Sequence, residues 1–103
     1  MDPSDRHTPQ DRFRGRARLF RALANETRLF ILDRISRGEC CVCDLAELTG
    51  LDQSTVSKHL ARLSSVGLVE GERRGHHVYY RPKEPSVAGW IDGRDTHDDK
   101  RQV

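Results

Sequence analysis

The sequence predicts a fold of the α+β class, mainly helical with one small β-hairpin. Apolar residues recur at helical spacing in four stretches between residues 9 and 66. Alternating apolar and polar residues then follow on either side of a glycine between residues 68 and 81, which is typical of a hairpin. A chain of 103 residues can bury one modest core. We therefore expect one domain over residues 9–92, flanked by disordered polar ends at 1–8 and 93–103.

Two helices are expected in the first third of the chain. Thr8 can cap a helix and Pro9 suits its first position, and the apolar residues that follow predict a helix over 9–24. Asn25 is a good cap for a second helix, 26–37, which has a wide apolar face and ends at a glycine.

A helix-turn-helix is expected next. Two shorter helices, 43–49 and 53–66, are separated by a tight turn that contains Gly50, and Asp52 is placed to cap the second of them. The apolar residues of that second helix have the spacing i, i+4 and i+7 and should face inward: Val56, Leu60 and Leu63.

The hairpin should follow directly, with strands 68–73 and 77–81 around a basic turn centred on Gly75. Two prolines end the second strand. Apolar residues beyond them have helical spacing, which predicts a short last helix at 85–92 and about five helices in all.

Charge is distributed unevenly along the chain. The net charge is only +2, but residues 6–37 hold nine arginines against three acids, and residues 84–103 hold five acids against three bases. A basic body with an acidic tail fits a nucleic-acid partner, although arginine-rich helices can also be merely solvated. No apolar run approaches the ~20 residues of a membrane span. The first residues lack the apolar core of a signal peptide, so a cytoplasmic location with no membrane partner is expected.

The helix 53–66 has the side chains of a DNA-reading helix. Its first turns carry short hydroxyl and amide groups that can reach base edges in the major groove, while its basic residues and those of the hairpin tip suit phosphates. An ordinary solvated helix face is the alternative, and His59 is expected to support the helix rather than face a base. The candidate DNA-contacting residues are Gln53, Ser54, Thr55, Ser57, Lys58, His59, Arg62, Arg73, Arg74 and His76.

Three cysteines, Cys40, Cys41 and Cys43, lie within four positions. Such a cluster cannot be a scaffold of spaced disulfides, and in a reducing compartment it indicates metal binding or redox chemistry. Three thiolates suit a soft ion such as arsenite, antimonite or cadmium. The alternatives are a redox or persulfide sensor that forms a disulfide, and packing as small apolar residues, chiefly for Cys40. Structural zinc fits less well, because a closed site needs four ligands.

The spacing of the cysteines has a geometric consequence. Residues i and i+2 of a helix point roughly 200° apart, so Cys41 and Cys43 could not bind one ion while both are helical. Ion binding should then unwind or re-angle the start of the helix 43–49, which supports the DNA-reading helix. The N-terminus of that helix should also favour the thiolate form of the cysteines.

Four segments carry a family resemblance: LANETRLFIL (23–32), ECCVCDL (39–45), QSTVSKHLARL (53–63) and GLVEGERRGHHVYYRP (67–82). Over about residues 10–91 the chain resembles the ArsR/SmtB family of winged-helix, metal-responsive transcriptional repressors. The second segment is similar to the metal box of the arsenic-sensing branch, usually written ELCVCDL. The resemblance implies a homodimer that represses an operon until arsenite, antimonite or a similar ion binds, with no catalytic role and no organic cofactor.

The resemblance also assigns residues. Cys41 and Cys43 match the two thiols of the box, whereas Cys40 replaces its leucine and Ala46 stands where a further cysteine is often found. The family's alternative zinc site is only half matched, by Asp95-Thr96-His97. The first and last helices are implied as the dimer surface, with these candidates: Phe13, Ala17, Phe20, Val87, Trp90 and Ile91.

Overall fold

The computed structural model describes residues 8–83 of the chain. In order, its elements are a 3-10 helix (Pro9–Phe13), α1 (Arg14–Leu23), α2 (Glu26–Ser36), β1 (Cys40–Cys41), α3 (Val42–Thr49), α4 (Gln53–Ser65), β2 (Val69–Arg74) and β3 (His77–Pro82). The expected class, mainly helical with a small hairpin, is confirmed. Four α-helices lie within residues 8–83, and the fifth one expected, at 85–92, lies outside them. None of the helices in the described part is long and apolar enough to cross a membrane.

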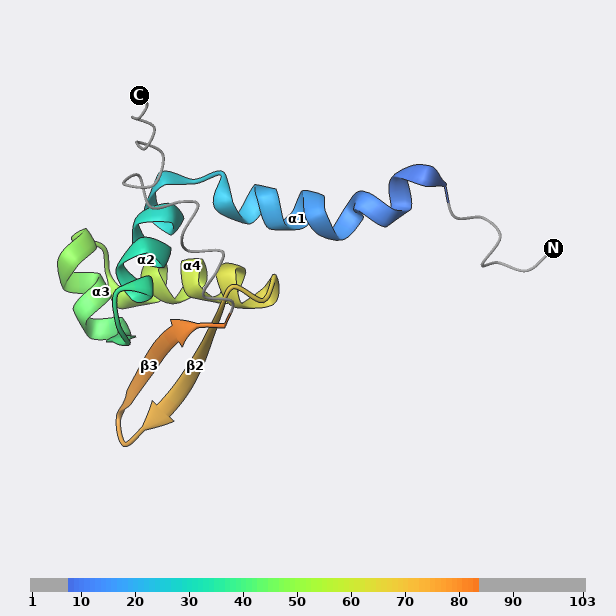
Figure 1. The fold of residues 1–103 in the computed structure, drawn as a ribbon. Coiled ribbons are helices and arrows are strands. Elements are labelled where there is room, and N and C mark those ends of the chain that lie inside the picture. Colours follow the sequence, from blue (N-terminus) through green and yellow to red (C-terminus); the bar gives the residue numbers. More distant parts are fainter. Residues whose placement is uncertain (1–7, 84–103) are drawn as a thin grey trace, which may run out of the picture.

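The three helices α2, α3 and α4 form the body of the molecule (Figure 1). α1 extends away from this body as an arm, and the β2–β3 hairpin projects from a different side as a wing (Figure 1). α3 and α4 are joined by a tight turn in which Gly50 has a φ of 75°, a conformation that glycine adopts without a steric penalty. They form the expected helix-turn-helix.

One apolar core holds these elements together. It is built from the inward faces of α2 and α4, the start of the wing and single residues of α1, β1 and α3: Leu23, Ile31, Leu32, Ile35, Cys40, Leu45, Val56, Leu60, Leu63, Leu68 and Val69. The three residues of α4 that were expected to face inward are all fully buried. Burying an aliphatic side chain contributes roughly 1.5–3 kcal/mol, so this cluster is the main source of stability.

Side-chain caps begin α2 and α4 where the sequence predicts them. The Asn25 side chain accepts a hydrogen bond from the backbone N–H of Arg28 at 2.9 Å, and the Asp52 carboxylate accepts one from Thr55 N–H at 2.8 Å. Each cap satisfies one of the N–H groups that lack a partner inside the helix.

The first helix differs from its expected span of 9–24. Its first turn is a 3-10 helix, in which the Arg14 N–H donates to the carbonyl of Asp11, and the α-helix itself covers only Arg14–Leu23. The prediction treated both segments as one helix because capping residues mark where a chain turns but do not distinguish 3-10 from α geometry.

The sheet has three antiparallel strands in the order β1-β3-β2, where a simple hairpin was expected. The additional strand, β1, lies along β3 and pairs Cys40 with Tyr80 and Cys41 with Tyr79. A strand of two residues has no apolar period, so the sequence could not indicate it. In the hairpin itself β2 extends to Arg74, which makes that residue part of the strand and leaves Gly75 and His76 as the turn.

Candidate metal centre and nucleic-acid interface

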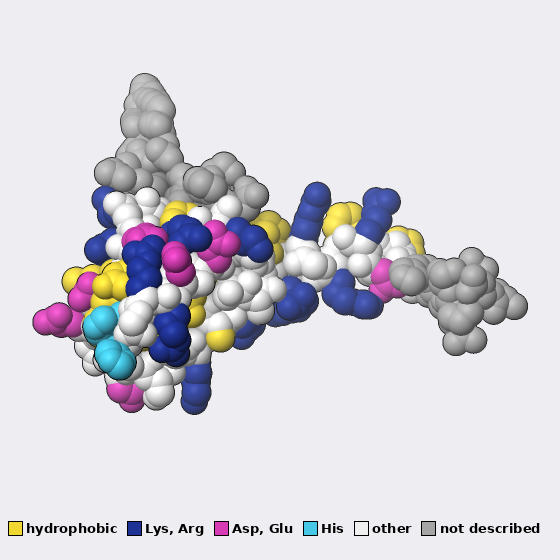
Figure 2. Space-filling model, turned by 90° about the horizontal axis from the view of Figure 1, so that it is seen from below, with side chains coloured by type: hydrophobic (Ala, Val, Ile, Leu, Met, Phe, Trp, Pro, Cys, Tyr) yellow, Lys and Arg dark blue, Asp and Glu magenta, His cyan; other side chains and the backbone are white. Residues whose placement is uncertain are grey.

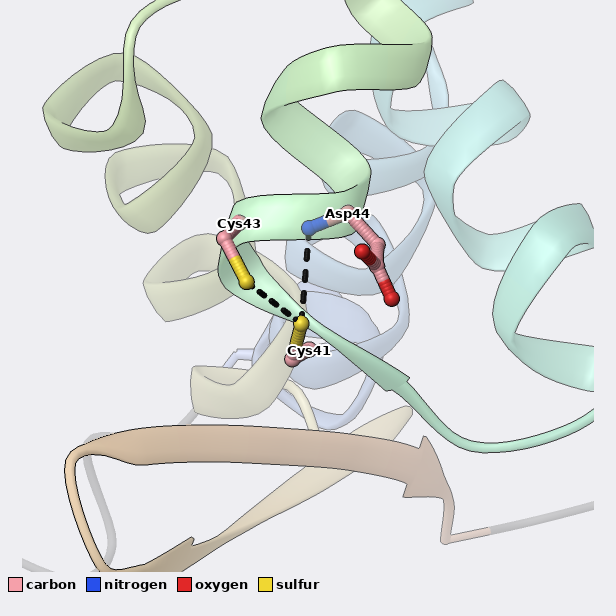
Figure 3. Close-up of side chains that lie close together, drawn as sticks. All are labelled: Cys41, Cys43 and Asp44. Atoms are coloured by element: carbon pink, nitrogen blue, oxygen red, sulfur yellow. Dashed lines mark hydrogen bonds between the residues drawn. The ribbon is translucent and has the colours of Figure 1, made fainter.

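Cys41 and Cys43 converge at the start of α3 (Figure 3). Cys41 is the N-cap residue, with extended backbone angles (φ −86°, ψ 161°), and Cys43 lies in the first helical turn. Their Sγ atoms are 2.7 Å apart, and Cys41 Sγ also accepts a long hydrogen bond from the Asp44 N–H at 3.4 Å. Ion binding was expected to unwind or re-angle the start of this helix, because two helical residues at i and i+2 point apart. Only Cys43 is helical, so the two sulfurs already lie close together without unwinding.

Burial governs the protonation of Cys41. Loss of solvent, followed by the hydrogen bond with Cys43, raises the pKa of the Cys41 thiol to about 11, and the opposing hydrogen bond from the Asp44 N–H is weaker. The expectation that the helix N-terminus makes this residue a thiolate is wrong, because desolvation outweighs the helix N–H group. Cys41 is a neutral thiol at pH 7, and an ion that binds it must displace a proton.

Cys40 lies on the other side of β1. Successive residues of a strand point to opposite faces, so Cys40 enters the apolar core whereas Cys41 faces Cys43. The Cys40 side chain is 1% exposed, and burial also raises the pKa of its thiol. A group of possible metal-ligand atoms within 4.8 Å of one another comprises Cys41, Cys43 and Asp44. The structure thus brings together two of the three cysteines.

His77 joins this cluster from the wing. Its Nδ1 atom lies 3.8 Å from Sγ of Cys43, although 34 positions separate the two residues. His77 is not among the residues expected from the sequence, because only the pairing of β1 with β3 places the start of α3 beside the wing. The only signal in the sequence was a histidine in the hairpin of a chain that also carries clustered thiols.

The candidate DNA-reading face of α4 is exposed at its first two turns. Gln53, Ser54, Ser57 and Lys58 are exposed, and Thr55 is half-buried. Ser54 donates its hydroxyl to the Asp52 carboxylate at 3.1 Å, so it also supports the cap. Gln53, Ser57 and Lys58 are the residues of this face that are best placed to reach a partner.

The side chain of Arg28 contacts His59. The Arg28 guanidinium lies 3.4 Å from His59 Nδ1 and also donates to the backbone carbonyls of Ala22 at 2.6 Å and Arg21 at 3.2 Å. Burial and the Arg28 charge lower the pKa of His59. Because arginine can only donate, the Nδ1 atom must accept, which requires the neutral imidazole. Arg28 therefore links the end of α1 and the start of α2 to α4, which suits a supporting role for His59.

The basic residues at the wing tip differ in their surroundings. Arg74 forms ion pairs with Glu39 at 2.7 Å and with Glu72 at 3.0 Å, and its guanidinium lies over the Tyr79 ring. Arg73 and His76 are exposed, and Arg73 forms no ion pair within residues 8–83. Arg73 is thus better placed than Arg74 to meet a phosphate.

A second basic group lies between α1 and α4. Arg18, Arg21 and Arg62 line an open hollow together with Ser65 and Val66. Lys and Arg side chains are also spread along the arm and over the body (Figure 2). Three guanidinium groups around one hollow suit an anion such as a DNA phosphate. Arg62 is among the residues expected from the sequence, but Arg18 and Arg21 of α1 are not, because the three converge only after folding.

Comparisons with known proteins place the chain in a family. Residues 25–71 match the family model described as bacterial regulatory protein, arsR family. The chain is 41% identical over 75 residues to arsenic resistance transcriptional regulator ArsR1 of Pseudomonas putida, an alignment that covers 72% of this chain and 58% of that protein. It is 47% identical over 75 residues to the arsenical resistance operon repressor of Escherichia coli, covering 70% and 62%. The chain thus spans about three fifths of each of these relatives.

The fold agrees with a solved structure of the same kind. The homodimeric winged helix-turn-helix DNA-binding domain Mb0332 of Mycobacterium bovis, a possible ArsR-family transcriptional regulator, superposes with a TM-score of 0.77 at 34% identity. That comparison covers 95% of this chain and 96% of the other. With the helix-turn-helix, the wing and the cysteine pair at the start of α3, the chain belongs to the arsR family of bacterial regulatory proteins.

Proposed function

We propose that the chain is a cytoplasmic, homodimeric transcriptional repressor that releases its operator DNA when a thiophilic metal or metalloid binds Cys41 and Cys43. Arsenite and antimonite are the first candidates for the inducer, followed by cadmium. The observation that carries the proposal is the convergence of the two sulfurs, 2.7 Å apart, at the first turn of the helix-turn-helix. The names of the two arsenic-resistance relatives support the choice of inducer.

The cysteine pair, without Cys40, is the proposed ion site. Cys40 is excluded because its side chain is 1% exposed and packs in the core, so using it as a ligand would open the core. Thiolates are the ligands that soft ions prefer. A tetrahedral ion with metal–sulfur bonds of about 2.3 Å holds two sulfurs roughly 3.8 Å apart. Binding would therefore push the two Sγ atoms apart by about 1 Å from their 2.7 Å separation.

This displacement gives a route from the ion to the DNA. Cys41 is the N-cap of α3, and its sulfur accepts the Asp44 N–H. An ion that takes this sulfur changes the cap and re-angles the first turn of α3. α3 packs on α4 through the buried Leu45, so the orientation of the reading helix changes with it. A change in cap geometry therefore replaces helix unwinding as the proposed switch.

DNA binding is assigned to α4 and to the basic groups beside it. Gln53, Ser57 and Lys58 would enter the major groove with the exposed first turns of α4. Arg73 of the wing and the hollow formed by Arg18, Arg21 and Arg62 would hold phosphates. The remaining candidates, Ser54, Thr55, His59, Arg74 and His76, would support these contacts or add to them.

A thiol-redox or persulfide sensor is the second candidate. The proximity of two free cysteines favours it, since a disulfide between Cys41 and Cys43 would need little movement of the sulfurs. The raised pKa of the Cys41 thiol opposes oxidation and ion binding alike, because both use the thiolate. The names of the two arsenic-resistance relatives favour ion sensing, which we place first.

A gel-shift experiment with DNA from upstream of the gene tests both candidates. Reduced protein is titrated with arsenite, antimonite, cadmium and peroxide, alongside Cys40→Ser, Cys41→Ser and Cys43→Ser. Ion sensing requires that arsenite or another soft ion releases the DNA, and that Cys41→Ser and Cys43→Ser lose this response while Cys40→Ser keeps it. Release by peroxide alone would transfer the function to the redox class. DNA that stays bound under all four reagents would refute both.

A further inference from the structure

The wing carries an imidazole that lies against the cysteine pair. His77 begins β3, and its Nδ1 atom is 3.8 Å from Cys43 Sγ. On β3 the side chains of His77 and Tyr79 point to the same face, because they are two residues apart. Tyr79 is directly opposite Cys41 in the β1–β3 pair, so Cys41 shares that face as well. The register of β1 therefore brings His77 to the ion site.

The distances suit a shared ion. A tetrahedral cation with bonds of about 2.3 Å to sulfur and 2.05 Å to nitrogen holds the two ligand atoms roughly 3.6 Å apart. The observed separation of 3.8 Å between Cys43 Sγ and His77 Nδ1 is already close to this value. The His77 ring is also oriented by its edge contact with the Tyr79 ring, at 6.4 Å between centroids and an angle of 71°. His77 lies outside the group of ligand atoms within 4.8 Å of one another, which comprises Cys41, Cys43 and Asp44. The imidazole and the two sulfurs must therefore all adjust when an ion enters.

We propose that Cys41, Cys43 and His77 together bind a thiophilic divalent cation of the zinc group, such as Cd²⁺, with His77 as the third ligand. The proposal rests on the proposed function, because it uses the same two cysteines. Two thiolates and one imidazole are a donor set that zinc-group cations accept readily. Asp44, whose carboxylate lies in the same group of ligand atoms, or a water can take the fourth position.

His77 would also separate two classes of inducer. Trivalent arsenic prefers sulfur ligands and would use only the cysteine pair, whereas a divalent cation gains the imidazole. A cation held by all three residues would connect α3 to the wing tip, since His77 pairs with Arg74 in the hairpin and is the first residue of β3, the strand that contacts β1. The wing and the reading helix would then respond to the same binding event.

Cadmium titration of the reduced full chain tests the proposal. Binding is followed by the ultraviolet thiolate-to-cadmium charge-transfer band, with affinity measured by competition against a chelator. His77→Ala should weaken Cd²⁺ binding by about tenfold or more, whereas its arsenite affinity should stay within about twofold of the wild type. His76→Ala, which removes the neighbouring exposed imidazole, controls for non-specific binding and should leave the cadmium affinity unchanged. In the wild type, cadmium should shift the imidazole nitrogen resonances of one histidine, and those resonances should be missing from the spectrum of His77→Ala.

The outcomes separate this proposal from the function on which it rests. Equal cadmium affinity in the wild type and in His77→Ala, combined with its loss in Cys43→Ser, would remove His77 from the site and keep the cysteine pair. Cadmium affinity that survives Cys41→Ser and Cys43→Ser would overturn the ion site altogether. His77→Cys adds a third sulfur at the same place and should tighten arsenite binding. An unchanged arsenite affinity in that variant would show that the wing does not reach a bound ion.

Discussion

Single side chains define where helices begin, and Asp52 at the start of α4 is the clearest case. Its carboxylate accepts hydrogen bonds from Thr55 N–H and the Ser54 hydroxyl, and these contacts lower the pKa of Asp52 below its ordinary value of 3.8. A group with a depressed folded-state pKa contributes stability above its unfolded pKa and loses it as the pH falls through the folded value. Asp52 should therefore stabilise α4 fully at neutral pH, and this contribution should be lost as the pH falls through its lowered folded-state pKa.

Asp52→Asn tests this assignment, because asparagine caps a helix without titrating. The urea midpoint of the wild type should be at or above that of Asp52→Asn at pH 6, and the difference should vanish or reverse as the pH falls below the ordinary Asp pKa. Asp52→Ala, which lacks any cap, should be the least stable of the three at pH 6. Parallel pH curves for the wild type and Asp52→Asn would show that the carboxylate is not the cap.

The exposed face of α4 gives the second prediction at this scale. Ser57 and Lys58 are exposed and make no contact that the core needs. Ser57→Ala should weaken operator binding several-fold, and Lys58→Ala should also lower the slope of log affinity against log salt by about one, as the loss of a phosphate contact does. Ser64→Ala, near the other end of α4, is the control. A drop in melting temperature that parallels the loss of binding would make these residues structural.

At the scale of elements, the sequence predicted what local chemistry determines. Helix caps, the glycine turn and the inward face of α4 depend on neighbouring residues, and the structure confirms them. β1 depends on a strand about 40 positions later, so no local pattern could indicate it. That omission affected the site, where the helix N-terminus was expected to favour the thiolate of Cys41 and His77 was overlooked.

One position of the wing, Gly71, is packed so closely that it has no room for a side chain, which the sequence could not show. A Cβ atom placed on Gly71 would lie 2.8 Å from the ring of Tyr80, its partner across β2 and β3. The Tyr80 side chain also packs against the apolar core, which restricts the movement of its ring. Gly71→Ala should lower the free energy of unfolding by about 1–3 kcal/mol, as overpacking does. Gly15→Ala in α1, where no atom lies within 4 Å of the added carbon, should instead stabilise by about 0.5–1 kcal/mol. Chemical denaturation of both variants measures these two changes in the free energy of unfolding. A Gly71→Ala variant as stable as the wild type would show that the Tyr80 ring can rotate away.

At the scale of the whole molecule, most of the arm formed by α1 is not covered by the rest of the protein. Within α1 only Ala22 and Leu23, at its end, are buried, while Phe13 is 47% and Phe20 is 55% exposed. The two rings are seven positions apart and so lie on one side of the arm. An arm that leaves such rings in water suits the interface of the proposed dimer. A second apolar site, formed by Phe30 and Leu48, lies between α2 and α3 and offers a matched comparison.

Phe20→Glu should therefore convert the dimer to a monomer, as measured by sedimentation velocity, because a carboxylate cannot be buried between two arms. The circular dichroism spectrum should not change, since the ring takes no part in the core. Operator affinity should fall by about 100-fold or more, because one protomer can hold only one half-site. Leu48→Glu, which changes an equally exposed residue of α3, should remain dimeric and bind DNA normally. If Leu48→Glu dissociates the protein and Phe20→Glu does not, the interface lies in the groove between α2 and α3, and the arm has another partner.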